Sequence, residues 1–376
     1  MTRNRLILAV ALVVVVLVAG VLLWASRNPL KPFTGFPEGT EVVADDEGGV
    51  EISQAKGASV GDVDLDNVEE LGTAPDGRLA VSGFGWGLVA GPDGAVRFGT
   101  ETGSRALRLI PTPEDEVVVS SGCNLERVDA SGQRTRLLGR EEVCPVSEWA
   151  KIYSDPGIPA TFERIGPIMD LDVSAEGTLY LADAAGNRIL RLDGGGDLEQ
   201  VAGSGAPWGS IEDGQRAVDA SFKPGEVAAG PDGSVFLLPD PTEQRTGGVV
   251  YRIDPGGSIA AVGGGGYAQP SDGVRATDVE FAMPSDLAAD DAGNVYVGLN
   301  CCREEGGSGF RGVVRITSDG RLDVVFEPRL NKPEDFREVE PFLGGVAADD
   351  ESLYVSLTAG SSDEHYGKVM RVPLGS

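Results

Sequence analysis

The sequence repeats one short pattern six times, and this repetition constrains the fold more than any other feature. A β-rich tripeptide recurs at residues 79–81, 117–119, 179–181, 235–237, 295–297 and 353–355. An aliphatic residue precedes each tripeptide by seven or eight positions, and turn-forming stretches such as "APDG" and "GPDG" lie between the two. Alternation with a period of two residues, interrupted by turns, predicts antiparallel strands.

Each unit continues with two further strands. The third strand carries an Arg–aliphatic pair, such as Arg191-Leu192 or Arg252-Ile253, and a glycine turn leads into the fourth. Six four-stranded meanders predict an all-β six-bladed β-propeller of four-stranded antiparallel blades. The blades are expected at approximately residues 66–100, 104–139, 165–203, 221–263, 281–327 and 341–373.

The sixth unit ends at "KVMRVPLGS", after its third strand. A strand from the start of the domain can replace the missing fourth strand and thereby remove an open sheet edge. We expect residues 48–53 ("GGVEIS") to be this closing strand, so that the propeller covers residues 48–376.

The N-terminal segment differs from the rest of the chain. Residues 6–24 form an uncharged run of 19 apolar or small residues, which is about the length of a membrane-spanning helix. We expect a transmembrane signal-anchor there, with residues 1–5 as a cytoplasmic tail and residues 25–47 as a linker. A cleaved signal peptide is the alternative, but an A-x-A exit is missing. The anchor implies a single-pass protein of the cell membrane with an extracytoplasmic propeller.

Charge and cysteine content narrow the function classes. The formal net charge of −28 disfavours nucleic acid and favours cations or basic partners, although it can also serve solubility alone. An even number of cysteines in an exported domain allows two disulfides. Cys123 and Cys144 can staple a loop, which leaves the adjacent Cys301 and Cys302 to pair with each other or stay free.

A resemblance to a known family rests on two stretches. Residues 178–196 ("TLYLADAAGNRILRLDGGG") resemble an NHL repeat, with its aliphatic-Tyr-aliphatic-Ala-Asp and Asn-Arg-Ile segments. The stretch "GSIEDGQRAVDASFKPGEVAAGPDGSVFL" resembles the loop and first strand that precede such a unit in bacterial NHL propellers. The match is good in the third to fifth blades and thin in the others. The resemblance implies a propeller used for binding, because only a few members of the family are enzymes.

One loop sequence occurs in two similar copies, "DGQRAVDASF" and, 59 residues later, "DGVRATDVEF". We expect it at two successive blade junctions, with Phe222 and Phe281 filling the clefts between blades. The repeated polar residues can be structural. They can also form a rim that binds a protein, peptide or carbohydrate, and this candidate rim comprises Trp208, Asp213, Arg216, Asp219, Tyr267, Asp272, Arg275 and Asp278.

A second set of candidates lies on the inner strands. The residue before the inner-strand aliphatic is, in blades one to six, Glu70, Arg108, Asp170, Glu226, Asp286 and Gly345. The four carboxylates (Glu70, Asp170, Glu226 and Asp286) should converge at one mouth of the central tunnel. Hard oxygen ligands of this kind suit Ca²⁺. Solvated carboxylates, or carboxylates paired with Arg108, are the alternative.

Sequence motifs give little support for catalysis. His365 is the single histidine and lies in a charged loop, and G-x-S-x-G is absent, which argues against a Ser-His-Asp triad. Gluconolactonase-type propellers place metal ligands one residue earlier than the carboxylates noted above, where this chain offers only Glu69. We therefore expect a membrane-tethered, non-catalytic propeller that binds a ligand or protein as a sensor or scaffold. A gluconolactonase-like, Ca²⁺-dependent hydrolase or lyase with its metal centre at the tunnel mouth is the alternative, and a purely structural tether is third.

Overall fold

The computed structural model describes most of the region assigned to the propeller. The described residues are 33–34, 37–45, 50–63, 65, 68–74, 76–83, 85–101, 107–139, 165–207, 209–240, 248–300, 309–330, 342–360 and 365–374. No helix within these residues is long and apolar enough to cross a membrane. The predicted anchor, residues 6–24, lies outside them.

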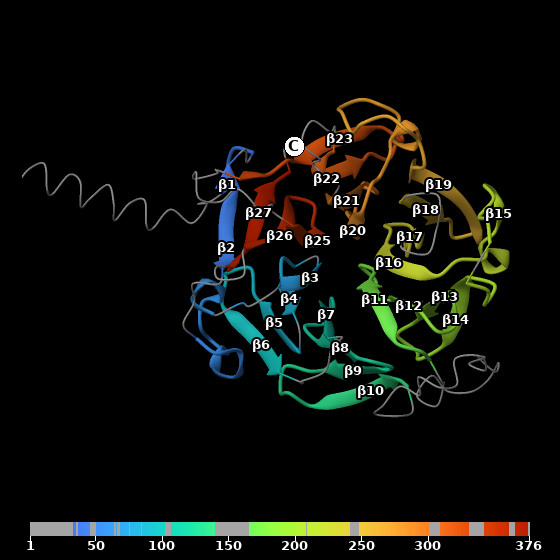
Figure 1. Cartoon of the computed structure of the whole chain (residues 1–376). Helices are drawn as coiled ribbons and strands as arrows, with labels where there is room; N and C mark the ends of the chain where they lie inside the picture. Colours follow the sequence, from blue (N-terminus) through green and yellow to red (C-terminus); the bar gives the residue numbers. More distant parts are fainter. Residues whose placement is uncertain are drawn as a thin grey trace, which may run out of the picture.

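Six antiparallel sheets surround a common axis, so the predicted six-bladed propeller of four-stranded blades is confirmed (Figure 1). Blade 1 contains β3 (Val68–Thr73), β4 (Leu79–Gly83), β5 (Trp86–Ala90) and β6 (Val96–Glu101). Blade 2 contains β7 (Leu107–Pro111), β8 (Val117–Ser121), β9 (Asn124–Val128) and β10 (Arg134–Leu138). Blade 3 contains β11 (Ile168–Val173), β12 (Leu179–Asp183), β13 (Arg188–Leu192) and β14 (Leu198–Ala202).

The second half of the ring repeats this order. Blade 4 contains β16 (Pro224–Ala229), β17 (Val235–Pro239), β18 (Val249–Ile253) and β19 (Ser258–Gly264), with β15 (Gln215–Arg216) outside β19. Blade 5 contains β20 (Pro284–Ala289), β21 (Val295–Asn300), β22 (Arg311–Ile316) and β23 (Leu322–Phe326). Blade 6 contains β25 (Phe342–Ala348), β26 (Ser352–Gly360), β27 (His365–Pro373) and β2 (Glu41–Asp45). A short pair, β1 (Phe33–Thr34) with β24 (Arg329–Leu330), lies outside the blades.

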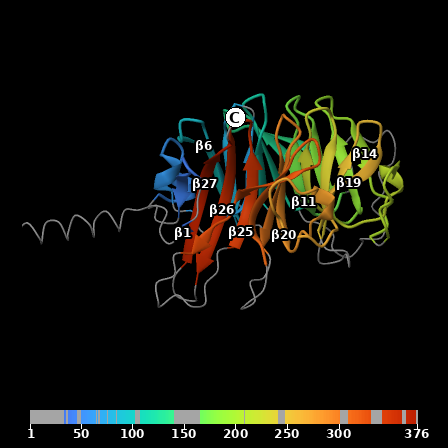
Figure 2. The same cartoon turned by 90° about the horizontal axis from the view of Figure 1, so that it is seen from above.

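The inner strands β3, β7, β11, β16, β20 and β25 lie nearest the axis, and the strands run from one face of the ring to the other (Figures 1 and 2). The turns after the inner strands follow the sequence signals. Gly77, Gly177, Gly233 and Gly293 have φ between 78° and 83°, a conformation that glycine adopts without steric cost. In blade 2 the same turn position is taken by Asp115, with φ of 62°.

The ring closes with a different strand from the one predicted. β2 pairs with β27, with Glu41 opposite Arg371 and Ala44 opposite Val369. The predicted closing segment, residues 48–53, instead contains the start of a 3-10 helix, η1 (Ile52–Gln54). The prediction failed because the chain after β2 first follows the outer edge of blade 1, so the strand that reaches β27 lies earlier in the sequence.

The repeated loop follows the same kind of path along the outer edge of a blade. The amides of Gly214 and Gly273 donate to carbonyls of β19 and β23, each the outer strand of the blade that the loop is about to enter. The 3-10 helices η5 (Ala217–Asp219) and η6 (Ala276–Asp278) follow. The loop therefore joins two blades by way of the outside of the second.

A third copy of this loop precedes blade 1 and was missed in the sequence. Gly57 donates to Val96 of β6, and η2 (Val60–Asp62) takes the place of η5 and η6. "GASVGDVDL", from Gly57 to Leu65, aligns with "GQRAVDASF" and "GVRATDVEF", but it shares with both only the first Gly and the Asp of the 3-10 helix. Those two identities are too few to be recognised without the hydrogen bonds.

The core lies between blades. Phe222 is fully buried among residues of blades 3 and 4, and Phe281 is fully buried among residues of blades 4 and 5. The expectation that these rings fill the clefts between blades is confirmed. Leu65, from the third loop copy, occupies the equivalent place between blades 6 and 1.

Candidate functional site

Irregular strand pairing sets the direction of the inner-strand candidates. Pairing of β3 with β4 skips Glu69, pairing of β16 with β17 skips Gly225, and pairing of β20 with β21 skips Ser285. β11 and β25 are irregular at the same level, whereas β7 pairs without interruption. A β-bulge re-aims the side chain beside it. The candidate position is therefore built by an irregularity that repeats in five of the six blades.

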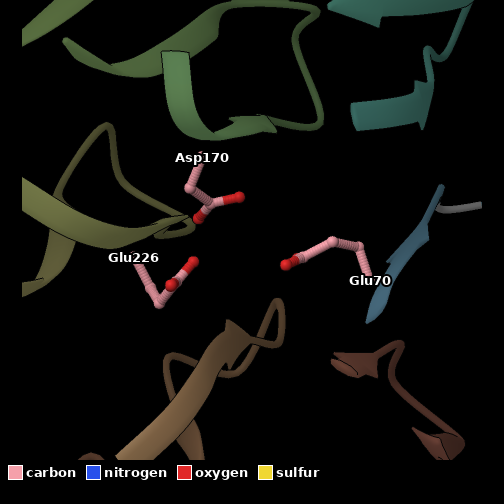
Figure 3. A group of neighbouring side chains, drawn as sticks. All are labelled: Glu70, Asp170 and Glu226. Carbon is pink, nitrogen blue, oxygen red and sulfur yellow. The ribbon is translucent and has the colours of Figure 1, made fainter. Parts of the chain in front are cut away.

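Three of the predicted carboxylates meet at the axis. Glu70, Asp170 and Glu226 each offer an oxygen, and these oxygens all lie within 4.8 Å of one another. Figure 3 shows the three side chains reaching toward a common point from three different strands. Asp286 interacts with the same three acids. Its pKa is raised by burial and then by repulsion from Glu70 and Asp170. We refer to Glu70, Asp170, Glu226 and Asp286 as the carboxylate ring.

Arg108 supplies the internal counter-charge. Its Nη1 forms an ion pair with Glu70, and its Nε donates to the carbonyl of Met169 at 2.8 Å, which links blades 1, 2 and 3. Burial alone lowers the pKa of Arg108, but attraction to all four carboxylates outweighs burial and raises that pKa overall. Arg108 therefore stays charged, and one cation faces four acidic groups.

Two members of the ring also hold the neighbouring blade. Asp170 Oδ2 accepts a hydrogen bond from the amide of Val227, in the next inner strand, at 2.7 Å. Asp286 Oδ2 does the same with Val346 at 2.5 Å, and its Oδ1 accepts from Leu287 at 2.7 Å. Both aspartates of the ring therefore join neighbouring inner strands.

Glu226 has a different environment. Its longer side chain reaches toward Asp170 and Glu70 (Figure 3), and its Oε2 is buried without a hydrogen-bond partner among the described residues. Burial, followed by repulsion from Asp170 and Glu70, raises the pKa of Glu226 well above its ordinary value. The Glu226 side chain also shares a hydrogen bond with Asp170, which requires a proton on one of the two acids. An ionised carboxylate whose Oε2 has no partner is costly in this place, so this oxygen favours a proton or another cation.

The other ring members shift in the same direction. Burial raises the pKa of Glu70 to about 7 in spite of Arg108, and burial also raises the pKa values of Asp170 and Asp286. The ring as a whole therefore holds protons at a pH where exposed carboxylates have lost them, or exchanges those protons for a bound cation.

Asp172 is a half-buried acid that the sequence analysis did not single out. Its Oδ2 accepts from the amide of Ala229 at 2.8 Å, and its Oδ1 accepts from Val173 at 2.7 Å. Burial raises its pKa to about 7. The alternating pair Asp170-Leu171-Asp172 was the available signal, because two acids around one buried aliphatic residue are unusual in a strand.

A cavity of about 720 Å³ extends from the ring along the axis. Glu70, Arg108, Asp170 and Asp286 line one end of it, and small residues of the inner strands, such as Gly72 and Ala289, line its wall. Further acids line the cavity beyond these, including Asp291 and Asp350 in the turns that follow β20 and β25. The cavity is thus acidic along much of its length.

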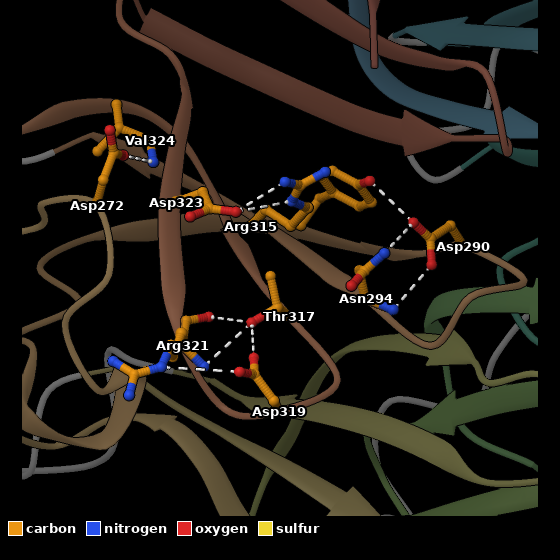
Figure 4. Close-up of polar contacts among 10 residues, drawn as sticks. Asp272, Asp290, Asn294, Arg315, Thr317, Asp319, Arg321, Asp323 and Val324 are labelled. Carbon is orange, nitrogen blue, oxygen red and sulfur yellow. Dashed lines mark hydrogen bonds and ion pairs between the residues drawn. The ribbon is translucent and has the colours of Figure 1, made fainter. Parts of the chain in front are cut away.

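The candidate rim residues mostly make local structural contacts. Asp213 Oδ1 accepts from the amide of Ala261 at 2.9 Å, and Asp272 Oδ1 accepts from Val324 at 2.8 Å (Figure 4). Each aspartate therefore ties its loop to the outer strand beside it. The repetition of this contact in two successive blades favours the structural interpretation of these two residues.

The other rim candidates lie on the same two loops. Arg216 and Asp219 form an exposed ion pair with a separation of 3.5 Å. Asp278 lies three residues after Arg275, and its main-chain carbonyl accepts a hydrogen bond from the amide of Tyr267. The side chain of Tyr267 is 94% exposed. Trp208, the intended partner of Tyr267 in a stacking surface, lies outside the described residues.

The NHL-like residues and the repeated arginines also make local contacts. Asp183 accepts hydrogen bonds from Gly166 and Gly186 and pairs with Arg188 at 2.8 Å. Arg315 pairs with Asp323 at 2.7 Å (Figure 4). These pairs stabilise individual blades.

The disulfide candidates remain a prediction. Cys123 is buried in the core between blades 2 and 3. Cys144, Cys301 and Cys302 lie outside the described residues, as does the side chain of His365.

Taken together, the fold and the site define a six-bladed β-propeller with a ring of buried and half-buried carboxylates around its axis. A protein of unknown function from Bacteroides thetaiotaomicron is similar over 88% of this chain and 75% of its own, with 12% identity and a TM-score of 0.54. An auxiliary nutrient binding protein from the same organism has the same coverage and identity, with a TM-score of 0.51. A gluconolactonase from Xanthomonas campestris has 15% identity over 82% of this chain and 86% of its own, with a TM-score of 0.46.

The two similarities with TM-scores above 0.5 show the propeller fold. No family model matches the chain, and no curated protein matches it. Membership of the NHL family is therefore not confirmed.

Proposed function

We propose that this chain is a non-catalytic binding propeller whose ligand is a cation held at the carboxylate ring. The observation that carries the proposal is the meeting of Glu70, Asp170 and Glu226 oxygens within 4.8 Å of one another. When the four acids are ionised, Arg108 balances only one of their charges, and a bound cation can balance the others.

The surroundings of the ring favour binding over chemistry. Of the described residues that line the cavity, none is a histidine or cysteine, and Arg108 is engaged by Glu70 and by Met169. Nucleophilic catalysis needs an activated nucleophile beside a base. A sensor or scaffold role needs only recognition. In this proposal residues 6–24 anchor the propeller outside the cytoplasm.

Calcium is one cation to consider, and the alternative function depends on it. The ring offers carboxylate oxygens from Glu70, Asp170 and Glu226, which is the donor type that Ca²⁺ prefers. Arg108 and the amide of Val227 already engage two of these groups, so water or substrate oxygens must complete the six to eight ligands of Ca²⁺. A Ca²⁺-dependent hydrolase or lyase is favoured by this donor set, although Glu69, at the gluconolactonase-like position, is exposed.

The test is stabilisation of the full chain by cations at matched ionic strength. A ligand that binds the folded state at 100 times its Kd raises the free energy of unfolding by about 2.7 kcal/mol. We expect at least one of CaCl₂, MgCl₂ and an alkylammonium chloride to do this for the parent chain and for Glu212→Gln, which removes an exposed charge. Glu226→Gln should abolish the effect.

Lactone and ester turnover, with and without a chelator, separates the two functions. An inert protein that is stabilised by a cation supports the binding function. Chelator-sensitive turnover that is lost in Glu226→Gln overturns it in favour of the enzyme. If no cation stabilises the parent chain, the binding site itself is refuted.

A further inference from the structure

Exposed apolar side chains gather where the inner strands begin. Four large apolar residues are exposed among the described residues, and three of them lie at this level: Met169 in β11, Met283 directly before β20, and Phe342 at the start of β25. Met283, 56% exposed, has a left-handed φ of 49°, which is uncommon for a residue with a side chain. Asp170 and Asp286 lie one and three residues further along the chain than Met169 and Met283, at the end of the cavity that is nearest these two methionines.

The ring is not uniform around the axis. On the side of blades 1 and 2, Glu70 is paired with Arg108. On the side of blades 3 to 5, Asp170 and Asp286 are partly engaged by backbone amides, and Glu226 Oε2 is buried with no partner among the described residues. The unsatisfied acceptor of the ring is therefore in blade 4.

The two methionines flank this acceptor in the ring order. β11, β16 and β20 are neighbouring inner strands (Figure 1), so Met169 and Met283 belong to the blades on either side of Glu226. Methionine side chains are flexible and polarisable, and they adapt to irregular apolar partners. An exposed apolar group beside a buried acceptor is typical of a binding site with a polar centre and an apolar border.

We propose that blades 3 to 5 form a subsite for a primary ammonium group on an apolar chain, with the ammonium at Glu226 and Asp170 and the chain against Met169 and Met283. This inference deepens the proposed function by naming the ligand class. A bare metal ion makes no use of the methionines, and a neutral apolar ligand leaves Glu226 unsatisfied. An ammonium group donates three hydrogen bonds, and the net charge of −28 attracts it from a distance.

The methionines provide the test. The chain contains four, namely Met1, Met169, Met283 and Met370, and Met370 is fully buried in blade 6. The full chain labelled with ¹³C at the methionine methyl groups is titrated with hexylammonium chloride, and Met169→Leu and Met283→Leu assign the signals. We expect saturable shifts of the Met169 and Met283 signals and none of the Met370 signal.

Matched probes separate charge from apolar contact. Hexanol keeps the chain without the charge, and ethylammonium keeps the charge without most of the chain, so each should bind at least tenfold more weakly. Glu226→Gln should abolish the shifts, and Glu212→Gln should leave them unchanged. Nα-acetyl-lysine N-methylamide tests whether the amine can be a lysine side chain rather than a free alkylamine.

The possible failures are distinguishable. If a metal cation stabilises the chain but hexylammonium does not shift Met169 or Met283, the ammonium subsite is refuted and the cation-binding function stands. If hexanol shifts both signals as strongly as hexylammonium, or Glu226→Gln binds as well as the parent, the role of Glu226 is refuted. If no cation has any effect, both proposals fall.

Discussion

Raising the pH from 5 to 8 should destabilise this protein, because the carboxylate ring must lose protons while it is buried. Burial raises the pKa of Glu70 from its ordinary 4.5 to about 7. Between pH 4.5 and about pH 7, Glu70 therefore keeps a proton in the folded state that it has released in the unfolded state. The contribution of this proton to stability is fully present below the pKa of the unfolded state, and it is lost as the pH rises through the pKa of the folded state.

The expected magnitude follows from Glu70 alone. At about 1.4 kcal/mol per pKa unit, the difference between 4.5 and about 7 corresponds to a loss of about 3 kcal/mol. Asp172, whose pKa burial also raises to about 7, contributes in the same direction, as do Asp170, Glu226 and Asp286. Because these groups interact, their contributions do not add, and the expected loss is on the order of 3 kcal/mol.

The pH window separates the ring and Asp172 from the exposed acids. Hydrogen bonds lower the pKa values of the exposed Asp93, Asp129 and Asp319, so their contribution to stability is lost only as the pH falls below about 4. The chain has one histidine, so few other groups titrate between pH 5 and 8.

The assay is urea unfolding of the full chain at several pH values, without multivalent cations. With a slope of about 3 kcal/mol per molar urea, the midpoint should fall by about 1 M between pH 5 and pH 8. Glu70→Gln should reduce this dependence, and Glu212→Gln should not. A midpoint that stays constant or rises with pH in the parent chain contradicts the buried and protonated ring.

Three further substitutions test the internal counter-charge and the packing. Arg108→Gln leaves Glu70 without its ion-pair partner. We expect the free energy of unfolding at pH 8, measured in urea, to fall by about 3–5 kcal/mol. An unchanged free energy of unfolding would show that the pair does not stabilise the fold. Phe222→Ala opens a cavity between blades 3 and 4 and should cost about 3–5 kcal/mol, whereas Tyr267→Ala, at an exposed site, should change stability by less than about 0.5 kcal/mol. Equal effects of these two substitutions would contradict the assigned core.

The sequence by itself determined the blades. Alternation of buried and exposed positions and the turn glycines, such as Gly77 and Gly233, are local properties, because they depend on side chains and φ angles a few residues apart. Their sixfold repetition was sufficient to predict the number of blades and the convergence of one inner-strand position. The deep burial of Phe222 and Phe281 followed from the same repetition.

Only the tertiary structure decided the details of the site. The closing strand is β2 rather than residues 48–53, because the path of the intervening chain along blade 1 depends on hydrogen bonds between distant residues. The bulges that aim the carboxylates arise from pairing between strands, which a single strand does not encode. Asp170 accepts a hydrogen bond from the next blade, while Glu226 Oε2 has no partner among the described residues. Neither feature can be predicted from the sequence, because both depend on distances between strands of different blades.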